Sequence, residues 1–179
     1  LLLDQGGQRR VSKITPSVVY NTVNQPIFPS EGTRYTGSID FAGIGGNTEY
    51  IQTRAEGIWY IPLNFISRKV SLGMRAEGQW IRPYGKTTTL PIFEKFFLGG
   101  EYSVRGFDMR TIGPRDPLSG VVTGGNKSVL FNGEFYIHIA GPVRLVLFYD
   151  AGQVRDEGES FIWSQKVTQT IPPDRGLLY

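Results

Sequence analysis

The chain has 179 residues, enough for one domain, with no cysteine, one histidine and 23 glycines. Its 19 Lys and Arg against 16 Asp and Glu give a net charge of +3 without a basic cluster, so nucleic acid is not an expected partner. No stretch approaches the ~18 consecutive apolar residues of a transmembrane helix, which leaves a transmembrane barrel open. The first residues do not form a signal peptide, and we expect the chain to be part of a longer protein.

Alternation of apolar and polar residues predicts six β-strands of roughly ten or more residues, and no segment has a helical period. After a polar lead-in, the strands are expected at 11–23, 34–43, 50–63, 69–84, 127–139 and 143–154. Pro16 makes the first of them irregular. Segments rich in turn-forming residues separate the strands. The longest irregular segment covers residues 85–126, and the residues from 155 onward show no sustained period.

The two faces of these strands differ in polarity. One face is apolar with Gly and Ala mixed in, and the other carries charged residues in mid-strand, as in a barrel with a wet lumen. We expect the first face to contact lipid and the second to face the interior. The lipid set is Ile39, Trp59, Leu72, Met74, Phe131 and Leu147; the interior set is Asp40, Arg54, Glu56, Arg75, Glu77 and Asn132. The alternative is a soluble antiparallel sandwich, whose strands are usually about half as long.

The irregular segment holds FFLGGEYSVRGFDMRTIGP, Phe96 to Pro114. Its centre is the motif Val104, Arg105, Gly106 and Phe107, a long cationic side chain beside a flexible glycine. Read alone, the motif is a surface loop with a solvated arginine.

This stretch resembles the sixth extracellular loop of BamA-type outer-membrane assembly proteins, a superfamily that includes the two-partner secretion transporters. YNTVNQPIFPSEGTRYTGSI resembles the family's strand, periplasmic turn and next strand, while NGEFYIHI and LFYDAGQV resemble the two strands after the loop. The resemblance implies an all-β, antiparallel transmembrane barrel of sixteen strands. The chain would supply strands eight to thirteen of that barrel, without the periplasmic POTRA domains.

In that family the arginine loop folds back into the lumen and its arginine meets acidic residues of the wall. The alternation of side chains between the two faces of a strand independently places Glu134 and Asp150 on the inward face of the two strands after the loop. Because a guanidinium offers five donors in a fixed fork, one arginine can bridge two carboxylates. We therefore expect Arg105 to be clamped by Glu134 and Asp150, with Phe107 packed on the inner wall.

Enzymatic function is not expected. The only histidine, His138, lies near a strand end, and a facing arginine would keep Glu134 and Asp150 ionised, which makes them poor acid–base catalysts. No spacing of metal ligands is present, and neither Gly99-Gly100 nor Gly124-Gly125 is followed by the residues of a phosphate loop. No cofactor or metal is expected.

The resemblance implies insertion and folding of β-barrel proteins in the bacterial outer membrane. The implied partners are unfolded outer-membrane proteins, the lipid bilayer and periplasmic lipoproteins of an assembly complex. The alternative is a protein-translocating pore of the two-partner secretion type. By the same resemblance, the turns at 24–33, 62–68 and 140–142 lie on the periplasmic side, and the connections at 43–49, 85–126 and from 155 onward lie outside.

Overall fold

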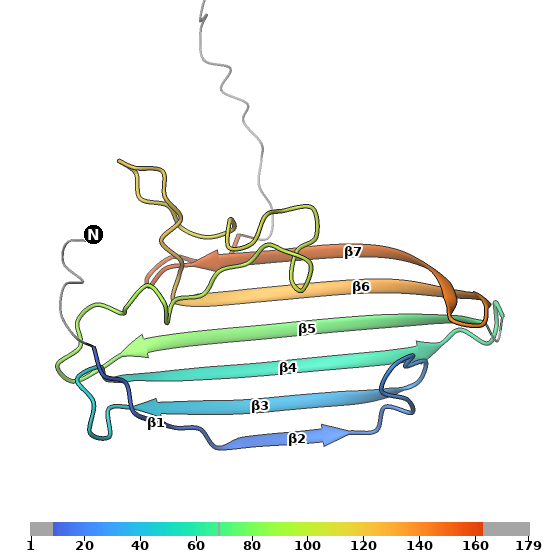
Figure 1. Cartoon of the computed structure of the whole chain (residues 1–179), viewed down its shortest axis with the longest axis horizontal. Coiled ribbons are helices and arrows are strands. Elements are labelled where there is room, and N and C mark those ends of the chain that lie inside the picture. The colour runs from blue at the N-terminus through green and yellow to red at the C-terminus, as the bar shows by residue number, and fades with distance from the viewer. Residues whose placement is uncertain (1–8, 68, 163–179) are drawn as a thin grey trace, which may run out of the picture.

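The computed structural model describes residues 9–67 and 69–162, which form one antiparallel sheet (Figure 1). Its strands are β1 Lys13–Ile14, β2 Ser17–Asn21, β3 Gly32–Ala42, β4 Tyr50–Pro62, β5 Val70–Pro83, β6 Lys127–Ala140 and β7 Val143–Arg155. The order is β1-β3-β4-β5-β6-β7, and β2 also pairs with β3. Each long strand thus neighbours the next one in the sequence, so the fold is an all-β meander as predicted.

Strands β3 to β7 have 11 to 14 residues each, and a tilted transmembrane strand needs about 9–11. Within the described residues, no helix has the length and apolar character needed to cross a membrane.

The first expected strand, 11–23, is in fact two short strands, β1 and β2, on either side of Thr15 and Pro16. Both pair with β3. Proline has no N–H to give to a sheet, so the interruption falls where the backbone cannot donate. The carbonyl of Pro16 still accepts from the Ile39 N–H at 3.1 Å, which keeps the two pieces in register on β3.

Strand register places the expected interior set on one face, where oppositely charged side chains of β4 and β5 pair. Arg54 lies 2.8 Å from Glu77, and Arg75 lies 2.9 Å from Glu56 and also contacts Glu77. A charged face therefore runs along the middle of the sheet. The aromatic side chains of Tyr35 and Trp59 pack together on the opposite face, joined by a 2.8 Å hydrogen bond from the indole N–H to the phenol oxygen.

The main cluster of buried apolar residues lies between the charged face and the segment 85–126, near the loop end of the sheet. Wall residues Ala42, Tyr50, Ile81, Leu130 and Val154 pack there with loop residues Leu90, Phe96, Leu98 and Val104. The loop thus supplies one half of the core. Its path over β6 and β7 positions the arginine motif (Figure 1).

Candidate functional site

The tip of the loop, residues 99–107, is a compact turn whose backbone bonds to itself. The Gly100 N–H donates to the Phe107 carbonyl at 2.9 Å, and the Gly99 N–H donates to Ser103 Oγ at 2.9 Å. Gly99 has a φ of +107°, and a Cβ there would lie 2.3 Å from the Asp108 carbonyl oxygen. This position therefore requires glycine for both its conformation and its space.

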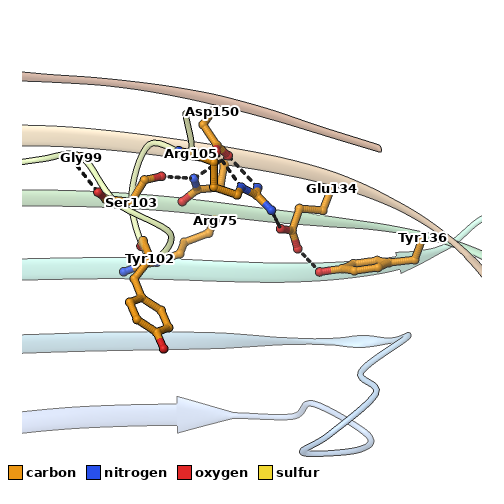
Figure 2. Close-up of polar contacts among 9 residues, drawn as sticks. Arg75, Gly99, Tyr102, Ser103, Arg105, Glu134, Tyr136 and Asp150 are labelled. Atoms are coloured by element: carbon orange, nitrogen blue, oxygen red, sulfur yellow. Dashed lines mark hydrogen bonds and ion pairs between the residues drawn. The ribbon is translucent and has the colours of Figure 1, made fainter. Parts of the chain in front are cut away.

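Arg105 reaches from this tip to carboxylates of two adjacent strands (Figure 2). Its Nε lies 2.7 Å from Asp150 Oδ2, one terminal nitrogen lies 2.7 Å from Asp150 Oδ1, and the other lies 2.5 Å from Glu134 Oε1. The Arg105 backbone N–H also donates to Asp150 Oδ2 at 3.0 Å. The Arg105 guanidinium thus forms a bidentate pair of hydrogen bonds with Asp150 and a single hydrogen bond with Glu134.

The two carboxylates differ in their access to water. The Asp150 side chain is 3% exposed and that of Glu134 is 26% exposed. The guanidinium also stacks over the Phe148 ring, 3.8 Å from its centroid. The hydrogen bonds to Asp150, and then the one to Glu134, raise the pKa of Arg105 above its ordinary value, so the arginine stays charged.

Two further side chains hold the loop by its backbone, and sequence reasoning did not give them this role. Asn132 Nδ2 donates to the Ser103 carbonyl at 2.7 Å and to Asp150 Oδ1 at 2.8 Å. An Arg75 nitrogen donates to the Tyr102 carbonyl at 3.1 Å. Parity had placed Asn132 and Arg75 on the inward face, but nothing in the sequence indicated how deep the loop reaches.

The other motif residues have separate surroundings. Val104 is 6% exposed and packs, with Leu98, over Gly152, where a Cβ would lie 2.6 Å from Leu98 Cδ1. Gly106 has a φ of +85° and open space around it, so its backbone conformation is what favours glycine. We expected Phe107 to pack on the inner wall, but the residue is 56% exposed, so the described strands do not bury its ring.

The single histidine of the chain does not contribute to this site. His138 lies at the far end of β6, where its backbone N–H donates to the Lys69 carbonyl at 2.8 Å. Among residues 9–67 and 69–162, no group of three or more His, Cys, Asp or Glu side chains could hold a metal ion. The arrangement is an ionic anchor for a loop.

Comparison with known proteins agrees with this architecture. The sequence matches the Omp85 superfamily domain over residues 2–174. The outer membrane protein assembly factor BamA of Nitratidesulfovibrio vulgaris is 32% identical over 148 residues, which cover 80% of this chain and 18% of that protein. BamA of Neisseria meningitidis serogroup B is 31% identical over 76% of this chain and 18% of its own length. A SAM50-like protein of Drosophila melanogaster is 31% identical over 62% of this chain and 24% of its own.

A solved structure shares the fold. BamA from Haemophilus ducreyi lacking POTRA domains 1–3 superposes with a TM-score of 0.71 at 26% identity, covering 80% of this chain and 30% of that one. The chain thus spans about a fifth of the length of the curated BamA relatives it matches. It belongs to the Omp85 superfamily, as a BamA-type β-barrel protein of the bacterial outer membrane.

Proposed function

We propose that the protein carrying this chain inserts and folds β-barrel proteins in the outer membrane, without enzymatic chemistry. Its substrates are unfolded outer-membrane proteins, and periplasmic lipoproteins assist it. The observation that supports this most strongly is the match to BamA assembly factors across most of the chain.

Within that protein, the chain supplies a wall of the barrel and the loop that plugs it. Strands β2 to β7 correspond to strands eight to thirteen of a sixteen-stranded barrel. The turn end of the sheet faces the periplasm, and the loop 85–126 enters from outside. In this arrangement Arg105 pins the loop across the lumen by binding Asp150 and Glu134 at distances of 2.5 to 2.7 Å.

Reconstitution of the full-length protein in lipid vesicles tests the proposal. Unfolded outer-membrane protein is added, and its folding is followed by protease protection and by the heat-dependent gel mobility of the folded product. Faster folding than in empty vesicles supports an assembly factor. Vesicles that release a secreted passenger protein but do not speed barrel folding would instead indicate a translocating pore.

The clamp is tested in the same assay. Arg105→Ala should slow substrate folding, whereas Arg54→Ala should not, because Arg54 lies on the same face but makes its ion pair with Glu77 rather than with the loop. If Arg105→Ala folds substrate as fast as the unmodified protein, the clamp is not needed for assembly activity.

A further inference from the structure

The turn between β2 and β3 is closed by its own side chains. The Asn24 side-chain oxygen accepts from the Ser30 N–H at 3.2 Å and the Glu31 N–H at 3.3 Å, and its amide nitrogen donates to Ser30 Oγ at 2.9 Å. The Asn24 backbone N–H also donates to the Glu31 carbonyl at 3.1 Å. Residues 24–31 therefore form a turn that is closed by its own hydrogen bonds.

This unit reaches a distant strand through Phe28. The Arg144 guanidinium, at the start of β7, lies 4.9 Å from the centroid of the Phe28 ring and 4.9 Å from that of Tyr136 on β6. In the sheet order, β7 is four strands away from β3. At about 4.8 Å between neighbouring strands, the path along the sheet is roughly 19 Å. The turn therefore crosses the polar face, at the end of the sheet opposite the long loop.

The same contacts continue to the arginine loop. The Tyr136 hydroxyl donates to Glu134 Oε2, and Glu134 Oε1 accepts from Arg105 at 2.5 Å (Figure 2). Tyr136 and Glu134 are two residues apart on β6 and share its polar face. Phe28, Arg144, Tyr136, Glu134 and Arg105 thus form an unbroken series of contacts between the turn and the loop.

We propose that Arg144 and Tyr136 are positioning residues that couple docking of the turn 24–31 to seating of the arginine loop. Phe28 orders Arg144, Arg144 holds the Tyr136 ring, and the Tyr136 hydroxyl orients the Glu134 carboxylate toward Arg105. A partner that draws the turn away from the lumen weakens the hold on the loop, and release of the loop loosens the turn by the same factor. This coupling does not depend on what the barrel assembles, because its test observes the turn and the loop directly.

The experiment uses full-length protein in detergent micelles. This chain has no cysteine, and any cysteine elsewhere in the full-length protein is first replaced by serine. Spin labels at Gln25→Cys and Val143→Cys then report the position of the turn. Hydrogen exchange of residues 100–107 reports loop seating, because it measures local opening. Phe28→Ala should broaden the distance distribution and raise exchange of the loop by about fivefold or more, the usual lower range of coupling between sites.

Phe65→Ala is the matched control, since Phe65 lies in the next turn at the same end and is 83% exposed. It should change neither measurement. Arg144→Lys keeps the charge but loses the flat stacking surface, so it should also broaden the distance distribution and raise exchange of the loop. It provides a second test of the coupling if Phe28→Ala folds poorly.

Tyr136→Phe isolates the link, because it keeps the ring beside Arg144 and removes only the hydroxyl. The turn should stay docked while loop exchange rises, and adding Phe28→Ala should raise it no further. An undisturbed turn in Phe28→Ala would overturn the docking. Normal exchange of the loop in Phe28→Ala would overturn the coupling. The coupling would also be overturned if Phe28→Ala raised loop exchange by the same factor in the Tyr136→Phe variant as in the unmodified protein.

Discussion

Replacing Arg105 with alanine should remove about 3–4 kcal/mol of unfolding free energy, most of it through Asp150. Breaking a buried ion pair costs about 3–5 kcal/mol because the remaining charge is left without its partner. Asp150 is 3% exposed, so this range applies to it. The lower end is expected because Asp150 keeps two donors, the Asn132 amide at 2.8 Å and the backbone N–H of residue 105 at 3.0 Å.

Glu134 should contribute much less. Its side chain is 26% exposed and binds the guanidinium through a single nitrogen, so the pair resembles a surface ion pair of about 0–1 kcal/mol. Glu134→Gln should therefore cost about 1 kcal/mol, and Asp150→Asn about 3 kcal/mol. Arg105→Lys should recover only part of the loss, since an ammonium cannot reproduce the two-pronged bond to Asp150.

Urea unfolding in lipid vesicles, followed by tryptophan fluorescence, measures these differences. Arg105→Ala is also combined with Asp150→Asn and, separately, with Glu134→Gln. Each double variant should lose less unfolding free energy than the sum of its two single variants, and the coupling should be larger for Asp150. Strictly additive losses for both pairs, or a larger coupling for Glu134, would refute the assignment of the buried bond to Asp150.

Three further changes test the other anchors of the loop. Gly152→Val should cost about 1–3 kcal/mol in the same urea assay because its Cβ would collide with a packed leucine, whereas Gly78→Ala, with open space around it, should cost little. Tyr50→Phe should cost about 1–2 kcal/mol and speed proteolysis of the loop, because it removes a 2.8 Å hydrogen bond to Glu94 from a tyrosine that is fully buried. Asn132→Ala should raise hydrogen exchange of the loop tip and cost about 1–2 kcal/mol, and unchanged exchange would show that its bond to the loop carbonyl is not needed.

Much of the sheet could be predicted because a two-residue period is a local property of the sequence. Strands β3 to β7 begin and end within two residues of their expected bounds. The break between β1 and β2 was harder to place, since Pro16 signals a missing donor but does not say whether the strand bends, bulges or stops. The one-residue irregularity between His138 and Ala140 had no signal in the sequence.

The candidate site divides in the same way. Parity placed Glu134 and Asp150 on the inward face, and the family resemblance directed Arg105 toward them. The contacts of Asn132, Arg75 and Phe148 with the loop depend on how far the loop descends along the wall. At that depth Leu98 and Val104 pack on the bare backbone of Gly152, a long-range fit that no local pattern encodes.

The loop is held by two kinds of contact with different consequences. Burial of Leu90, Phe96 and Leu98 against the wall provides affinity, but apolar packing tolerates small shifts at little cost. The Arg105 clamp contributes modest net energy after desolvation, yet its fork fits Asp150 in one orientation only. Replacing the clamp with apolar residues of similar volume could therefore preserve stability while the loop loses its fixed depth. The directional geometry of the ion pair therefore specifies the position of the loop along the wall.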